Sequence, residues 1–135
     1  MQVHDLFAEA VRAREQAYAP YSGFAVGAAL QGKSGKVYHG CNIENASYGA
    51  TICAERVALG NAVAHGEREF TAIAVVGEAV EPVVPCGMCR QVLAEFSSHM
   101  MVVMGTLSGK TVTLRLDELY PYAFEASALG GSDSK

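Results

Sequence analysis

The sequence lacks the features of several large classes of protein. It has only 10 lysine and arginine residues against 14 acidic ones, and its formal net charge at pH 7 is -4. Because no cluster of basic residues is present, a polynucleotide substrate is disfavoured. No apolar run approaches the length of a membrane span, and the first residues lack the basic and apolar regions of a secretory signal. We therefore expect a cytoplasmic protein without membrane or nucleic-acid partners.

Cysteine is also scarce, since the 135 residues include only Cys41, Cys53, Cys86 and Cys89. In a reducing compartment such thiols are more often free or metal-bound than paired, so we expect no disulfide framework. Half of the residues are apolar, which is enough to bury one core, but the chain leaves no room for a second domain. We expect a single catalytic domain over residues 1–135, of which about 130–135 form a disordered tail.

The hydrophobic pattern predicts alternating helices and strands. Apolar residues at helical spacing indicate helices, and short apolar runs between turn residues indicate strands. The predicted helices cover residues 5–18, 52–64, 86–97 and 117–124, and the predicted strands cover 24–30, 37–44, 70–76, 101–104 and 111–114. Thr51 is the expected N-cap of the second helix, which places Cys53 and Glu55 in its first turn.

The order of these elements predicts an α/β fold, a three-layer sandwich with a mixed five-stranded sheet and helices on both faces. A right-handed crossover places each helix N-terminus at the carboxyl end of its preceding strand. The helices that carry Cys53 and Cys86 should therefore open at one edge of the sheet, which brings together two thiols that are 33 residues apart. The positive ends of two helix dipoles at this edge favour thiolate over thiol.

Two short stretches carry the most specific chemistry of the chain. Cys86 and Cys89 are three residues apart, which lets both sulfurs reach one metal ion, and Cys53 can supply a third thiolate. Glu55 follows Cys53 by two residues, so on a helix its side chain points roughly away from the sulfur. A carboxylate there is better placed to hold a proton than to bind the metal. Three thiolates with an open fourth position form the donor set of a catalytic zinc site.

Spacing alone leaves other interpretations open. Cys41 can complete a closed four-cysteine cage in a structural zinc module without catalytic function, although such a cage gives no reason for Glu55. Glu55 alone can be a helix-start carboxylate that the helix dipole stabilises, and Arg56 can be a surface residue. We expect Cys41 to be a buried thiol.

Motifs in residues 18–30, 42–49, 53–56, 85–91 and 119–124 follow one another in the order of a known family. Through them the chain resembles the small homotetrameric zinc-dependent cytidine deaminases. The resemblance implies a cytidine deaminase-like fold and one zinc ion per subunit. It also implies the hydrolysis of cytidine and 2′-deoxycytidine to uridine and 2′-deoxyuridine with release of ammonia, in pyrimidine salvage. A homotetramer with active sites shared between subunits is implied as well.

The resemblance also assigns roles to single residues. It makes the three motif cysteines the zinc ligands, Glu55 the group that moves protons, and Arg56 the hydrogen-bond donor to the sulfurs. It implies that Phe24 packs on the pyrimidine face and that Asn42 and Glu44 bind the ribose hydroxyls. Ala54 is a further implied substrate contact. The remaining implied contacts reach the site from neighbouring subunits and are Ala46, Tyr48 and Phe124.

The predicted ribose contacts bear on the choice of substrate. A carboxylate accepts a hydrogen bond from a free sugar hydroxyl and repels a phosphate, so Glu44 favours nucleosides over nucleotides. Related deaminases that act on aminopyrimidine nucleoside antibiotics share the cysteine stretches, which leaves such an antibiotic as an alternative substrate. Asn42 and Glu44 favour the simple nucleosides.

Overall fold

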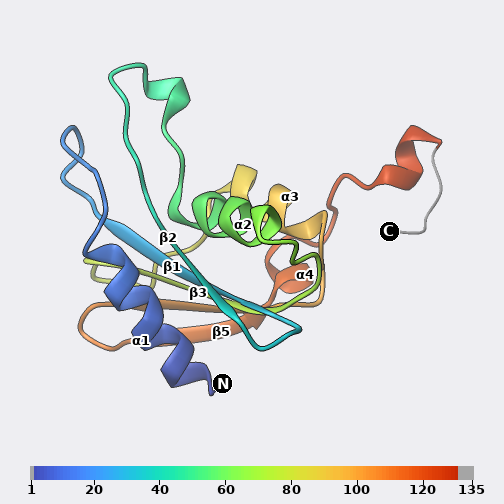
Figure 1. Ribbon diagram of the computed structural model, residues 1–135, viewed down its shortest axis with the longest axis horizontal. Helices are drawn as coiled ribbons and strands as arrows, with labels where there is room; N and C mark the ends of the chain where they lie inside the picture. Colours follow the sequence, from blue (N-terminus) through green and yellow to red (C-terminus); the bar gives the residue numbers. More distant parts are fainter. Residues whose placement is uncertain (1, 131–135) are drawn as a thin grey trace.

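The computed structural model describes residues 2–130, which form one five-stranded sheet with helices on both faces (Figure 1). The elements are α1 (Val3–Arg14), β1 (Val26–Gly32), β2 (Val37–Cys41), η1 (Tyr48–Ala50), α2 (Ala54–Ala64), β3 (Phe70–Gly77), α3 (Gly87–Ala94), β4 (Met101–Thr106), β5 (Thr111–Arg115), α4 (Leu116–Leu119) and η2 (Ala126–Leu129). The predicted α/β sandwich is confirmed. Apart from Gly130, the predicted tail lies outside the described residues. None of the helices within residues 2–130 is long and apolar enough to cross a membrane.

The sheet topology brings the starts of two helices to one edge. The strand order is β2-β1-β3-β4-β5, in which β3 and β4 are parallel and the other neighbours are antiparallel. The parallel pair is joined through α3, as a crossover connection requires. Since β2 and β3 are each antiparallel to β1, they run in the same direction. Their carboxyl ends therefore lie at one edge, and α2 and α3 begin there as predicted.

The two faces of the sheet pack against different helices. Along a strand, successive side chains point to opposite faces, so the neighbours Ala29 and Leu30 belong to different hydrophobic clusters. Leu6 and Ala10 of α1 join Ala29 on one face. On the other face, α2 and α3 cover Leu30, and the buried Leu93 of α3 belongs to the same cluster. Figure 1 shows α1 separated from α2 and α3 by the sheet.

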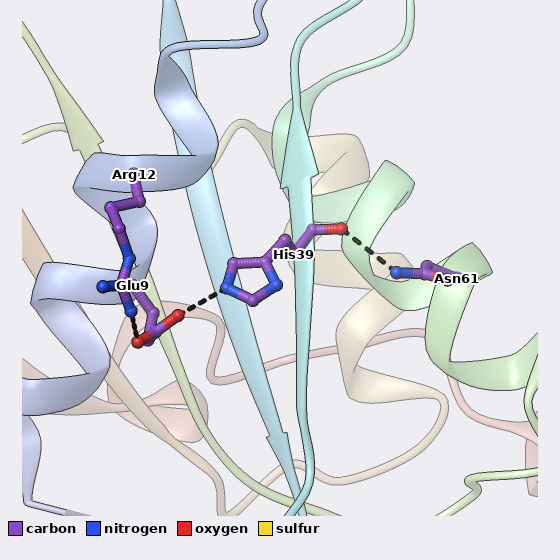
Figure 2. A network of polar contacts seen from close by, with 4 residues as sticks. All are labelled: Glu9, Arg12, His39 and Asn61. Atoms are coloured by element: carbon purple, nitrogen blue, oxygen red, sulfur yellow. Dashed lines mark hydrogen bonds and ion pairs between the residues drawn. The ribbon is translucent and has the colours of Figure 1, made fainter.

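A polar network connects the edge strand β2 with both helical layers (Figure 2). The Nε2 atom of His39 lies 2.6 Å from Oε1 of Glu9 in α1, and Glu9 also pairs with Arg12. The carbonyl oxygen of His39 accepts a hydrogen bond of 3.4 Å from Asn61 in α2. Because solvent reaches these side chains, the contacts orient the layers and contribute little to the free energy of unfolding.

Both cysteine-bearing helices begin later than predicted. Cys53 and Cys86 are the N-cap residues of α2 and α3, so Cys53 precedes the first turn of its helix. The prediction of Thr51 as the N-cap of α2 is wrong. Ile52 forms an isolated antiparallel bridge with Ile43, which keeps the chain extended up to Cys53.

Two other helices are shorter than predicted. The first ends at Arg14, because Tyr18 forms an isolated parallel bridge with Ile43 and draws the chain away from the helix. The predicted final helix is reduced to the single turn α4, which stops before Pro121. A proline ring cannot continue a helix from its interior.

Gly40 in β2 allows α2 to approach the sheet closely. A Cβ atom at this position would lie 2.3 Å from the carbonyl oxygen of Ala54 and 2.4 Å from the amide nitrogen of Ala58. Both are backbone atoms, so the helix itself would have to move. We expect Gly40→Ala to lower the free energy of unfolding, measured by urea denaturation, by about 3 kcal/mol.

Gly60 provides the matched control for this prediction. It lies within α2, and nothing is found within 4 Å of the place that its Cβ would occupy. Alanine has a higher helix propensity and a smaller unfolded-state entropy, so Gly60→Ala should raise the free energy of unfolding by about 1 kcal/mol. Equal effects of the two substitutions would contradict the close approach at Gly40.

Candidate active site and metal centre

Three cysteines meet where α2 and α3 begin. The Sγ atoms of Cys53 and Cys86 are 3.7 Å apart, and together with Cys89 all three sulfurs lie within 4.8 Å of one another. Two thiolates bound tetrahedrally to zinc at about 2.3 Å lie about 3.8 Å apart, so the cluster fits a zinc ion. Cys41 is not part of the cluster. It pairs with Gly27 in the sheet, and burial raises the pKa of its thiol. The arrangement therefore fits a three-cysteine zinc site and not a four-cysteine cage.

Cys53 and Cys89 differ in how readily their thiols lose a proton. Hydrogen bonds from the Cys89 thiol and from Arg56 lower the pKa of Cys53 to about 5. The pKa of Cys89 is raised, because its proton is held in the hydrogen bond to Cys53 and because the sulfur is buried. Cys53 thus becomes a thiolate more readily than Cys89, and a thiolate is the form that binds zinc.

Arg56 places a positive charge against the sulfurs. Its Nη2 atom lies 3.8 Å from Sγ of Cys53 and 3.4 Å from the carbonyl oxygen of Thr51. Three thiolates around a divalent ion carry a surplus negative charge, which weakens the ion as a Lewis acid. The guanidinium lies where it would offset part of that charge.

Glu55 lies beside the cluster and is only 4% exposed. Burial, together with the negative charge of Cys53, raises its pKa to about 7. A carboxyl group of this pKa can take up and release a proton near neutral pH, which a general acid and base must do. Glu55 lines a pocket together with Cys53 and Cys86.

The pocket at Glu55 has a volume of about 300 Å³. Its lining is mostly apolar, as is usual for sites that take small organic molecules. Four of the predicted substrate contacts line it: Phe24, Asn42, Glu44 and Ala54. Several other lining residues were not predicted as substrate contacts, and they include Ser22, Val26, Thr51, Val83 and Val84. Ser22 and Val26 lie within the motif of residues 18–30, and Val83 and Val84 directly precede the second cysteine motif, so these four had a local indication.

The polar side of the pocket is held by side chains that follow β2. Asn42 donates a hydrogen bond of 2.8 Å to the carbonyl oxygen of Phe24 and accepts one of 2.9 Å from the amide of Val26. Hydrogen bonds from the side chain and backbone of Ser22 hold the pKa of Glu44 below its usual range. The pocket therefore offers a fixed amide and an ionised carboxylate to a ligand.

Three predicted contacts lie outside this pocket. Tyr48 is 76% exposed and lines an adjoining hollow, where its ring centroid is 6.1 Å from that of Tyr21, and Ala46 is exposed two residues earlier. Phe124 lines a separate hollow near the end of α3, where Gln91 hydrogen-bonds both its amide and its carbonyl group. Within a single chain these three residues do not meet Glu55.

Comparison with known proteins identifies relatives of this chain. Residues 1–106 match the family model of the cytidine and deoxycytidylate deaminase zinc-binding region. A cytidine deaminase of Sporosarcina psychrophila is 51% identical over 130 residues, which are 96% of this chain and 96% of that protein. A cytidine deaminase of Halalkalibacterium halodurans is 53% identical over 122 residues, which are 90% of this chain and 92% of that protein. A crystal structure of the cytidine deaminase from Burkholderia pseudomallei matches with a TM-score of 0.90 at 52% identity, covering 92% of this chain and 100% of that chain.

Proposed function

Because the chain belongs to the family of zinc-dependent cytidine deaminases, we propose that it hydrolyses cytidine and 2′-deoxycytidine to uridine and 2′-deoxyuridine with release of ammonia. The observation that carries this proposal is the buried Glu55 in a pocket that also contains Cys53 and Cys86 of the zinc site. A zinc ion that only stabilised the fold would need neither an adjoining pocket nor a buried acid.

Glu55 moves the protons of the reaction. Cys53, Cys86 and Cys89 would hold a zinc ion, which would lower the pKa of a water molecule so that it can attack C4 of the pyrimidine. Glu55 accepts a proton from this water and donates it to ring nitrogen N3. It accepts the second proton of the water and passes it to the departing amine, which leaves as ammonia. One carboxylate of pKa about 7 serves both transfers.

The other pocket residues hold the nucleoside. Phe24 packs against the pyrimidine face, and Ala54 lines the pocket beside Glu55. Asn42 and Glu44 bind the ribose hydroxyls. The backbone contacts of Asn42 leave one donor and one acceptor position on its amide for this purpose.

The active enzyme is a homotetramer in this proposal. Tyr48 and Phe124 are 76% and 60% exposed and lie outside the pocket of their own chain, which supports a role in the pocket of a neighbouring copy. Ala46, close to Tyr48 in the sequence, reaches the same neighbouring site. The proposed location is the cytoplasm, where thiolate ligands stay reduced, and the proposed role is pyrimidine salvage.

Parallel assays with cytidine and cytidine 5′-monophosphate test the substrate. We expect the zinc-loaded protein to release ammonia from cytidine. The change in ultraviolet absorbance as cytidine is converted to uridine measures the rate. The ionised Glu44 carboxylate repels a phosphate at the sugar, so kcat/KM should be lower for cytidine 5′-monophosphate than for cytidine. Equal use of both compounds would contradict the role of Glu44, and no turnover of cytidine would contradict the proposed function.

A further inference from the structure

Ser22 contacts both oxygens of the Glu44 carboxylate at the rim of the pocket. The amide of Ser22 donates a hydrogen bond of 3.0 Å to Oε1, and its hydroxyl group donates one to Oε2. The amide of Tyr21 donates a further hydrogen bond of 2.9 Å to Oε1. Glu44 is therefore held in one orientation by the segment that precedes β1.

The Ser22 hydroxyl limits the hydrogen-bonding positions on Glu44 that a ligand can use. An ionised carboxylate offers about four lone-pair positions, two on each oxygen. The amides of Tyr21 and Ser22 occupy those of Oε1, and the Ser22 hydroxyl occupies one on Oε2. The position that remains is on Oε2. A sugar hydroxyl that binds Glu44 must therefore use this position.

The segment that carries Ser22 is itself fixed to the segment that carries Glu44. The amide of Gly23 donates to the carbonyl oxygen of Ala19 at 3.0 Å, and the amide of Glu44 donates to the carbonyl oxygen of Tyr18 at 2.8 Å. Gly23 has a φ of 71°, which a glycine adopts without strain. Ser22 thus reaches Glu44 from a turn of defined geometry.

Phe24 has an anchor that does not depend on Ser22. Its amide donates to the Ser22 hydroxyl at 2.9 Å, but its carbonyl oxygen also accepts a hydrogen bond of 2.8 Å from Asn42. Without the hydroxyl, the exposed amide of Phe24 can bind water instead. Loss of the Ser22 hydroxyl should therefore affect the contact with the sugar and leave the contact with the pyrimidine intact.

We propose that Ser22 is a positioning residue for sugar recognition, whose hydroxyl group directs the free lone pair of Glu44 to one ribose hydroxyl. This inference rests on the proposed function, because it takes a nucleoside sugar as the group that Glu44 binds. Ser22 acts through Glu44 and does not itself need to contact the substrate.

A double-mutant cycle tests this role. Ser22→Ala should lower kcat/KM for cytidine about tenfold, a loss in the range of one hydrogen bond to a charged group. Ser22→Thr keeps the hydroxyl and should stay within about twofold of the wild type. In a Glu44→Gln background, Ser22→Ala should change kcat/KM by less than about twofold, since the carboxylate that Ser22 orients is gone. Thermal unfolding of each variant checks that the fold is retained.

Two results would overturn the inference. One is an equal loss of kcat/KM in both Glu44 backgrounds, which would give Ser22 a role in loop structure alone. The other is unchanged kinetics of Ser22→Ala in the wild-type background. If zinc-loaded wild-type protein fails to convert cytidine, the proposed function is wrong, and the inference that rests on it is wrong as well. The wild-type assay therefore separates the two kinds of failure.

Discussion

Glu55→Gln is expected to lower kcat for cytidine by about a thousandfold, within the range attributed to positioned acid and base groups. The amide that replaces the carboxyl group can neither accept the proton of the attacking water nor pass it to the ring nitrogen. Glutamine has nearly the same volume as glutamate, so the buried side chain should still pack and the chain should fold. Steady-state kinetics together with the zinc content of the purified variant measure the effect.

Measuring the zinc content distinguishes loss of the proton carrier from loss of the zinc site itself. Glu55 is not a zinc ligand in this account, so the variant should still bind one zinc ion per chain. Glu78→Gln, at an exposed position, makes the same chemical change and should leave kcat unaltered. Unchanged turnover in a zinc-loaded Glu55→Gln variant would disprove the role of Glu55 as the proton carrier.

Cys89→Ser is expected to remove zinc and activity together. Cys89 is fully buried within the three-cysteine cluster, and a serine hydroxyl is a poor ligand for zinc. Loss of a group that only orients a ligand already lowers metal affinity about 10–100-fold, so loss of a ligand should lower it by more than about a hundredfold. Zinc analysis of the dialysed protein and uridine formation give the two readouts.

Cys41→Ser is the matched control for Cys89→Ser. It makes the same change at the one cysteine that lies outside the cluster, so zinc content and kcat should match the wild type. If Cys41→Ser lost its zinc as readily as Cys89→Ser, the four-cysteine cage would be the better account of the site.

The zinc ligands could be predicted from the sequence because their proximity follows from local spacing and topology. Cys86 and Cys89 lie close together on one helical turn, independently of how the rest of the chain folds. Cys53 joins them because β2 and β3 run in the same direction, which the order of elements already indicated. The burial of Glu55, which determines its pKa, depends in contrast on how α2 packs, and no spacing rule gives that.

Features that depend on distant pairings could not be predicted. Thr51 has the right side chain for an N-cap, but the bridge between Ile43 and Ile52 outweighs this local preference. Ser22 contacts Glu44 across 22 positions of sequence, and nothing in its local pattern indicates a partner. The places of Tyr48 and Phe124 depend, in the proposed tetramer, on surfaces of other copies that one sequence does not locate.

Titration of the zinc-free protein with zinc, with uridine formation as the readout, tests the central claim most directly. A chelator first removes the metal under reducing conditions, and zinc is then added back in known amounts. We expect the rate of conversion of cytidine to uridine to rise linearly and to level off at one zinc ion per chain. Full activity without zinc, or no uridine at one equivalent, would contradict a three-cysteine catalytic zinc site.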